Sequence, residues 1–434
     1  MVIKFAVVMG IFLSLVPLLV WLERRASAMM QDRLGPNRVN IFGFKVLGVV
    51  QNVADVIKLL LKEDFCPANA NKIMFLLGPC LVFIPAVVAP IVIPFADSIH
   101  LKSRIVSFQV ADIETGLLFV FAIASLGVYG FIMSGWASNN KYSLLGAMRS
   151  CAQMISYEVT LGLAAVGILM IFATSDSVAS FELNHIIRAQ GETLNLFGLP
   201  IPKWGIVVQP IGFLLFLVAS YAETNRLPFD MPEDEATLVA GYHTEYGGMK
   251  FAIFFMSEYI AMITASCLVV ILFFGGWQIP WASTKLLADH APLVARIIVG
   301  LTGLGALLVS AVWWHVVHNK VYSYGISPKI LELSNNLKRM IIYGMIAGGV
   351  LLIIASLFFI PSQMPEVVRA SIAAFAQFGT FMVKLGFFLF LYIWIRWTIP
   401  RFRYDQVMRL GWKILLPLAL LNIFVTGAVS LALS

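Results

Sequence analysis

Charged side chains are scarce in this sequence of 434 residues: they make up 12% of it, about half the share of an ordinary soluble domain. The four cysteines lie far apart and form no CxxC pair, which argues against zinc or iron–sulfur ligation and against a disulfide framework. The six histidines fall in predicted loops or at the ends of apolar runs, whereas a membrane-embedded haem needs imidazoles inside the spans. We therefore predict a chain with no metal site or redox centre of its own.

Hydrophobic residues, in contrast, make up 60% of the chain. A membrane-spanning helix needs about 20 apolar residues. The runs that qualify are 2–22, 73–95, 113–135, 155–174, 205–223, 251–275, 293–316, 339–360, 372–396 and 412–432. The first run ends in "WLERRASAMM" and lacks a basic leader, so we expect an uncleaved helix rather than a signal peptide. The sequence predicts an all-α polytopic membrane protein with about ten transmembrane helices in a single membrane domain, 1–434.

The distribution of positive charge predicts the orientation of the chain. If the N-terminus is outside, the inward segments hold 21 of the 30 Lys and Arg residues and the outward segments hold eight. These inward segments are 23–72, 136–154, 224–250, 317–339 and 396–413. The positive-inside rule therefore places both termini outside. The same rule accounts for the net charge of +7, and no basic block interleaved with aromatic residues suggests a nucleic-acid partner.

The first inward loop, 23–72, contains a candidate amphipathic helix. In "KVLGVVQNVADVIKLLLK", polar Gln51, Asp55, Lys58 and Lys62 recur at helical spacing among aliphatic residues. The segment is too short and too charged to span, so we expect it to lie in the membrane interface. From the pattern alone, a plain interfacial anchor is the simpler interpretation.

Four ionisable residues fall within predicted spans: Glu114, Glu158, Glu258 and Lys384. A charge within the membrane costs several kcal/mol unless it faces protein or water, so each is a candidate functional residue. One such residue could pair structurally at a helix end. Four of complementary sign favour a buried polar path through the bundle.

The inward loop 222–250 begins with "AETNRLPFDMPEDEATLVAGYHTEY", which gathers six carboxylates around a single arginine, Arg226. A solvated acidic loop is the simplest interpretation, yet "LPF" and "ATLVAGY" are apolar and favour burial. Crowded, partly desolvated carboxylates repel one another and hold protons more readily. The residues therefore predict an acidic relay that is embedded in the membrane and open to the inner side.

Five sequence blocks resemble the quinone-site membrane subunit of respiratory complex I, the proton-pumping NADH:quinone oxidoreductase (the H subunit in bacteria, subunit 1 in mitochondria). They are "WLERRASAMMQDRLGPNRVNIFG", "QNVADVIKLLLKED", "GWASNNKYSLLGAMRSCAQMISYEVTLGL", "AETNRLPFDMPEDEATLVAGYHTEYGGMKFAIFFMSEY" and "PRFRYDQVMRLGWKILLPL". The blocks stand in the family's order between residues 21 and 420. Such long motifs are highly specific.

The resemblance implies a subunit of an enzyme, located in the bacterial plasma membrane, that walls a quinone chamber. Quinone is then the substrate, while FMN, the iron–sulfur clusters and the quinone head-group ligands belong to soluble partner subunits. Small membrane subunits and antiporter-like subunits are the other implied partners. The amphipathic helix becomes the gate where quinone enters from the bilayer.

By motif, the chamber residues are Glu23, Arg24, Arg25, Arg33, Arg38, Asp55, Arg226 and Phe229. The implied proton path comprises Asp230, Glu233, Glu235, Glu245, Glu158, Glu258, Lys384 and Arg396.

The sequence departs from the family pattern in two places. The usual Glu-x-Glu-x-Glu run has Glu233 and Glu235 but then Thr237, and Asp234 is too far round a helix to replace the third carboxylate fully. The second departure is the segment 281–372, where two apolar runs are added to the eight spans usual in the family. We interpret this segment as an inserted hairpin on the outside of the bundle, with a structural or assembly role.

Two other functions compete with this interpretation. The homologous subunit of a membrane-bound hydrogenase shares the fold and the acidic loop, but the "QDRLGPNRV" block and the Asp55 helix favour a quinone enzyme. An independent ion–proton antiporter would also use intramembrane Glu and Lys residues. Transporters of that kind usually contain inverted repeats with paired broken helices, and the sequence shows no such repeat.

Overall fold

The protein is described here by a computed structural model that covers 2–33, 35–36, 39, 48–101, 104–172, 181–196, 199–231, 238–319, 328–358, 360–361 and 363–433. The long helices are α1 (Val2–Met30), α3 (Lys72–Val88), α4 (Gly116–Ala137), α5 (Lys141–Phe172), α10 (Gly248–Phe273), α12 (Ala291–Asn319), α13 (Pro328–Phe358), α14 (Glu366–Thr398) and α16 (Leu416–Leu433). Shorter helices are α2 (Val50–Leu61), α6 (Leu183–Ala189), α7 (Gly205–Val208), α8 (Pro210–Glu223), α11 (Thr284–Asp289) and α15 (Tyr404–Leu410). Single turns are η2 (Ala89–Val92), η3 (Gly241–His243) and the π-helical η4 (Gly411–Leu415), which joins α15 to α16.

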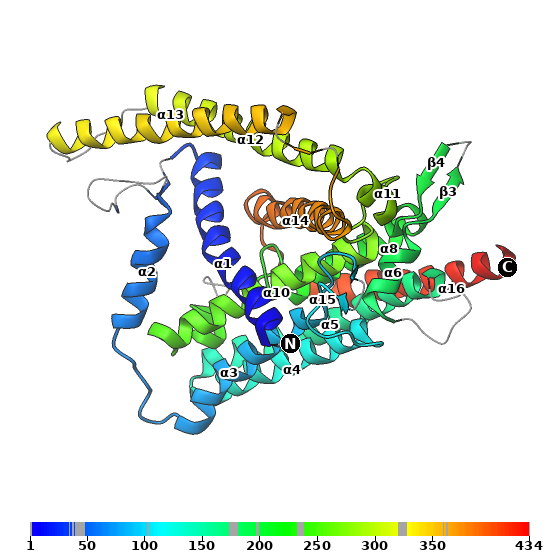
Figure 1. Cartoon of the computed structure of the whole chain (residues 1–434). Helices are drawn as coiled ribbons and strands as arrows, with labels where there is room; N and C mark the ends of the chain where they lie inside the picture. Colours follow the sequence, from blue (N-terminus) through cyan, green and yellow to red (C-terminus); the bar gives the residue numbers. More distant parts are fainter. Residues whose placement is uncertain are drawn as a thin grey trace.

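Strands are confined to two small antiparallel hairpins within the described part of the chain. The first pairs β1 (Ile99–Leu101) with β2 (Arg104–Val106). The second pairs β3 (Thr193–Leu196) with β4 (Leu199–Pro202), and it projects at the right of Figure 1. The prediction of an all-α membrane fold is therefore confirmed.

Every one of the ten predicted spans coincides with a helix. Nine helices in the described ranges are long and apolar enough to cross a membrane. The tenth predicted span, 205–223, is interrupted: α7 ends at Val208 and α8 begins at Pro210. The hydrophobic runs therefore predicted the number of segments correctly, and only this one lacks the expected length.

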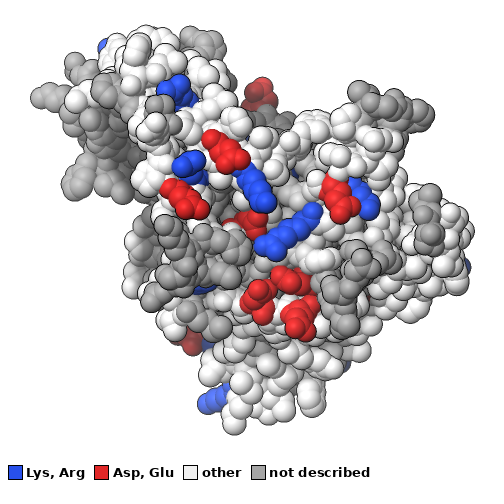
Figure 2. All heavy atoms as spheres, turned by 45° about the vertical axis from the view of Figure 1, so that its right-hand side comes forward, with Lys and Arg blue, Asp and Glu red and all other residues white. Residues whose placement is uncertain are grey.

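Long-range polar contacts divide the loops into two sets. At one end of the bundle the contacts join predicted inward segments to one another: Arg226 to Glu23, Arg401 to Asp230, Asn140 to Glu245 and Lys250 to Asp64. At the other end they join predicted outward segments: Lys4 to Ser107, Arg188 to Asp97, Thr284 to Asp97 and Trp281 to Pro200. This separation agrees with the alternating topology expected from the positive charges. Figure 2 shows a face on which charges of both signs gather near the middle, with wide uncharged areas around them.

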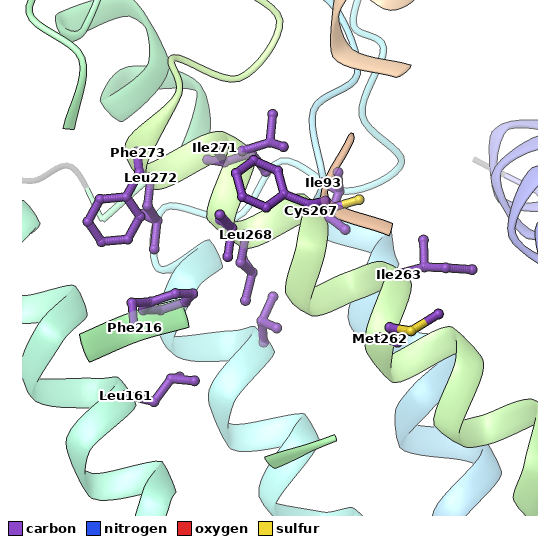
Figure 3. Close-up of a cluster of buried hydrophobic side chains, with 14 of the residues drawn as sticks. Ile93, Leu161, Phe216, Met262, Ile263, Cys267, Leu268, Ile271, Leu272 and Phe273 are labelled. Carbon is purple, nitrogen blue, oxygen red and sulfur yellow. The ribbon is translucent and has the colours of Figure 1, made fainter. Parts of the chain in front are cut away.

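The core is centred on α5, α8 and the outward half of α10. From Cys267 to Phe273 every residue of α10 is at most 4% exposed, because this stretch is hydrophobic all round and other helices enclose it. Figure 3 shows Leu161 of α5 and Phe216 of α8 beside these α10 side chains. This apolar cluster fills the outward half of the bundle, and it leaves the inward half for charged groups.

Helices α12 and α13 form a hairpin along the upper edge of the molecule in Figure 1. They occupy the two apolar runs of the predicted insertion. Leu301, Leu308 and Leu351 are all more than 60% exposed, so much of the hairpin's apolar surface is available to lipid or to a neighbouring subunit. The two helices approach closely where Gly303 meets Gly349, since a Cβ on Gly303 would lie 2.8 Å from the Gly349 carbonyl oxygen.

This close approach predicts a position-specific effect of a larger side chain. Gly303→Val should destabilise the hairpin by about 1–3 kcal/mol, because the added methyl groups meet the backbone of α13. Gly305→Val on the same helix is the matched control, since nothing lies within 4 Å of a Cβ there. Thermal unfolding of the purified complex, with limited proteolysis of the hairpin, checks the prediction. Equal behaviour of the two variants would contradict it.

Candidate functional site

A buried charge cluster lies at the inward end of the bundle, where four separate segments meet. Glu23 of α1 is 8% exposed, and its carboxylate forms ion pairs with Arg396 of α14 and, at 3.5 Å, with Nη1 of Arg226. The Tyr259 hydroxyl of α10 donates a hydrogen bond to the same carboxylate at 2.7 Å. One carboxylate therefore faces two guanidinium groups, which leaves positive charge in excess at this point.

Arg226 is the most enclosed member of the cluster, at 6% exposure. Its guanidinium lies over the Tyr259 ring, 4.0 Å from the ring centre, in a cation–π contact. Burial alone would lower the pKa of Arg226, but the Tyr259 hydroxyl and the Glu23 carboxylate raise it, so the side chain stays charged. Its Nε and Nη2 atoms are buried without a hydrogen-bond partner in the described part of the chain. They are donors available to a bound ligand.

Helix α2 docks on the inward end of α1 through its polar side chains. Asp55 pairs with Arg24 and accepts a hydrogen bond from Gln51 Nε2 at 2.9 Å. Asn52 Nδ2 donates to the Pro17 carbonyl oxygen at 2.6 Å. The apolar side chains of α2, among them Val56 at 51% exposure, face away from the bundle. The helix therefore turns its polar face to the protein and its apolar face outward, as an interfacial helix should.

The acidic loop is fixed to the bundle from both sides. Gln153 of α5 donates hydrogen bonds from Nε2 to the carbonyl oxygens of Ala222 and Phe229, each at 2.7 Å. Asp230 is 4% exposed and pairs with Arg401 at 3.0 Å. The beginning of the loop is therefore part of the buried core and not a solvated surface.

An internal cavity runs from this loop toward the apolar cluster. It provides about 100 Å³ of space for the centres of water molecules, and its lining comes from α3, α4, α5, α8 and α10. Most of its walls are apolar, and the ionisable groups that line it are Glu223 of α8 and Glu258 of α10. Glu258 accepts a hydrogen bond from the Tyr242 hydroxyl at 2.7 Å. Space of this size exceeds what several water molecules require.

Glu158 of α5 lies close to this cavity. Its carboxylate accepts a short hydrogen bond from the Ser125 hydroxyl of α4, and its charge interacts with that of Glu223. Three carboxylates, Glu158, Glu223 and Glu258, are thus gathered inside the bundle. Among the described residues no group of three His, Cys, Asp or Glu side chains could hold a metal ion.

Comparison with known proteins identifies the family. The family model described as "NADH dehydrogenase" matches residues 3–323 and 337–427. The H subunit of the NADH-quinone oxidoreductase of Thermomicrobium roseum is 40% identical over 425 residues, which cover 98% of this chain and 94% of that protein. The first H subunit of the Solibacter usitatus enzyme is 40% identical over 428 residues, covering 98% and 95%. The corresponding H subunit of Bdellovibrio bacteriovorus is 38% identical over 445 residues, covering 98% and 94%. The chain belongs to the NADH dehydrogenase family.

The structure brings only some of the chamber residues implied by the NADH dehydrogenase family into one site. Glu23 and Arg226 share the buried cluster, and Arg24 pairs with Asp55 beside it. Arg25 lies against Gly35, whereas Arg33 is exposed and donates to Gln31 Oε1 at 2.6 Å. Phe229 is 5% exposed and packs between the rings of Tyr157 and Phe402, so it supports the loop from inside the core. Arg38 lies outside the described residues.

The residues implied for the proton path also fall into groups. Asp230, Glu245, Glu158 and Glu258 lie in the inward half, and Glu245 accepts a hydrogen bond from Asn140 Nδ2 at 2.6 Å. Arg396 belongs to the Glu23 cluster. Glu233 and Glu235 lie outside the described residues, as do Asp234 and Thr237. Glu114, which was expected within a span, is exposed and precedes the start of α4.

Lys384 of α14 is placed at the opposite end of the bundle. Its Nζ donates to the carbonyl oxygens of Phe274, Gly276 and Gln278, at 2.7–3.0 Å, and lies over the ring of Trp204. These carbonyls follow the C-terminus of α10, where a positive charge is favourable for the helix dipole. No carboxylate of the described chain forms a salt bridge with Lys384.

Several residues of the site were not predicted from the sequence. Glu223 stands at the last position of the predicted span 205–223, and the argument applied to Glu158 could have identified it. Tyr259 follows Glu258 directly, so its side chain points in another direction on the helix and reaches Glu23. Nothing in the spacing indicates that Arg401 pairs with Asp230, because 171 residues separate the two.

The buried imidazole of His243 predicts a pH dependence of stability. His243 is 9% exposed, and burial lowers its pKa from 6.5 to about 4, against an opposite effect of the Asp230 carboxylate. Between pH 6.5 and 4 the unfolded chain binds a proton here and the folded chain does not, so stability falls as the pH falls through this window. The decrease should reach about 3 kcal/mol. Thermal unfolding at pH 7.5 and pH 5 measures it, and His243→Gln should show a smaller decrease.

Proposed function

We propose that the chain is the membrane subunit that borders the quinone chamber of a proton-translocating NADH:quinone oxidoreductase. The relatives that match 98% of the chain are named as the H subunit of NADH-quinone oxidoreductase. Quinone is the substrate of that complex, and the electrons reach it through FMN and iron–sulfur clusters held by partner subunits. The role of this chain is then to enclose the quinone and to respond to the change of charge when the quinone is reduced.

The charge cluster around Glu23 supports a position in the chamber wall. Its two guanidinium groups exceed its single carboxylate, and Arg226 has buried donor atoms without a partner among the described residues. Such a surface attracts the negative charge that a quinone gains on accepting electrons, and a buried charge is screened little. Helix α2, docked by the Arg24–Asp55 pair, supports a role at the point where quinone leaves the bilayer.

The observation that carries the proposal is the position of two neighbouring residues of α10. Tyr259 bonds to Glu23 in the charge cluster, and Glu258, one residue earlier, lines the cavity. The charge of Glu258 also acts on Arg226, which faces Glu23. A change of charge in the chamber therefore reaches the cavity across one turn of a single helix. The carboxylates Glu258, Glu223 and Glu158 would respond by shifting their proton occupancy, with Asp230 and Glu245 on the inner side.

The complex purified in mild detergent tests this function. We expect flavin and iron–sulfur absorbance together with NADH:quinone activity that quinone-site inhibitors block. Hydrogen evolution in place of quinone reduction would support the hydrogenase alternative. Ion–proton exchange by the chain alone, without partner subunits, would support the antiporter alternative.

A further inference from the structure

The membrane segment formed by α7 and α8 is interrupted at membrane depth. The 14 residues of α8 extend over only about 21 Å, less than the roughly 30 Å of a hydrocarbon core. Gln209 leaves the helical conformation, with φ −139° and ψ 65°, and Pro210 begins α8 without an N–H group to continue the helix. Irregular backbone at this depth is stable only where protein groups or enclosed water satisfy it.

Three polar side chains surround the break, and all are buried. Gln209 is 4% exposed, Asn422 of α16 is 6% exposed and Thr426 is 8% exposed. Gln209 Nε2 donates to Thr426 Oγ1 at 2.7 Å, and the Thr426 hydroxyl donates to the Asn422 carbonyl oxygen at 2.6 Å. Two buried atoms remain without a partner in the described part of the chain: Gln209 Oε1, an acceptor, and Asn422 Nδ2, a donor.

These two atoms face the same small region beside Gly212. A Cβ on Gly212 would lie 2.5 Å from Gln209 Oε1 and 3.4 Å from Asn422 Nδ2. The two amides form no direct hydrogen bond. A water molecule can donate to the oxygen and accept from the nitrogen at once, whereas a cation would be repelled by the N–H group and an anion by the carbonyl oxygen.

We propose that Gln209, Asn422 and Thr426 form a binding site for ordered water at the break between α7 and α8. The water completes the hydrogen bonding of the interrupted segment and joins α16 to it. Gly212 has no side chain, and this leaves the space that the water needs.

This site is separate from the carboxylate cavity. Gly167 of α5, which packs against the Gln209 amide, stands nine residues beyond Glu158, about 13 Å along the helix. On α8, the buried side chains of Leu215 and Phe216 come between Gly212 and the cavity-lining Ser220. The water site therefore belongs to the outward half of the bundle, and it does not depend on the proposed proton path.

An experimental density map of the whole complex, at a resolution that shows buried water, tests the site directly. We expect a water oxygen within about 3.2 Å of both Gln209 Oε1 and Asn422 Nδ2. A direct hydrogen bond between the two amides would overturn the proposal. So would the absence of density there in a map that resolves other buried waters.

A pair of alanine substitutions provides the second test. Gly212→Ala places a methyl group against both unpartnered atoms, so it should remove the water density and lower the unfolding temperature of the complex. Gly162→Ala on α5 is the matched control, because nothing lies within 4 Å of a Cβ at that position. Water density that persists at the break in the Gly212→Ala variant, or equal unfolding temperatures for the two variants, would contradict the proposal. NADH:quinone activity should persist in both variants, which keeps this test independent of the proposed function.

Discussion

Replacement of Glu158 by glutamine is expected to abolish NADH-driven proton translocation and to slow quinone reduction by about 100-fold, while the complex still assembles. Glutamine has nearly the same shape and can still accept the hydrogen bond from Ser125. It cannot release or bind a proton, and it removes the charge that acts on Glu223. Under the proposed function the path is then interrupted between two neighbouring carboxylates.

The measurement uses inverted membrane vesicles, with NADH oxidation and the quenching of a pH-sensitive dye recorded together. Glu114→Gln is a suitable control, because that carboxylate is exposed before the start of α4. It should leave both rates unchanged. Normal oxidation and normal pumping in the Glu158→Gln variant would refute the assignment of this residue to the path.

Replacement of Glu23 by glutamine should have the largest effect on stability. The carboxylate faces two guanidinium groups and accepts the Tyr259 hydrogen bond, and its side chain is only 11% exposed. Removing its charge leaves Arg226 and Arg396 buried without a counter-ion, which costs about 3–5 kcal/mol. We expect a complex that assembles poorly or unfolds at a much lower temperature, with loss of quinone reduction.

A neighbouring ion pair offers the comparison. Arg24 and Asp55 are 42% and 31% exposed, so Asp55→Asn removes a partly solvated pair and should cost only about 0–1 kcal/mol. Thermal unfolding and the yield of assembled complex would rank the two variants. A larger effect of Asp55→Asn than of Glu23→Gln would contradict the structural role assigned to the buried cluster.

The positions of the spans could be predicted because hydropathy acts over whole segments. Each of the ten runs contains enough apolar residues to decide its own fate, and the inward lysines and arginines then order the ends. The break at Gln209 was not predicted, since a proline at 210 also fits the first turn of an uninterrupted helix. It depends on contacts with Thr426 and Gly167, which are distant in sequence.

The site was predicted less completely than the fold, for a related reason. A carboxylate within an apolar run signals a function, and this identified Glu158 and Glu258. Partners that come from remote segments give no local signal, as the pairing of Arg401 with Asp230 shows. Lys384 illustrates the opposite error: its charge suggested a place among the carboxylates, yet three carbonyl oxygens at the end of α10 hold it.

The apolar cluster of Leu161, Phe216 and Leu268 has an electrical consequence. A layer without polar groups or water acts as the insulator of a capacitor, so most of the transmembrane voltage falls across it. The carboxylates on its inner side then remain close to the potential of the inner compartment. Protons exchanged among them do little work against the voltage. The work of about 2.3 kcal/mol for each charge moved through 100 mV is done where the proton finally crosses, in another part of the complex.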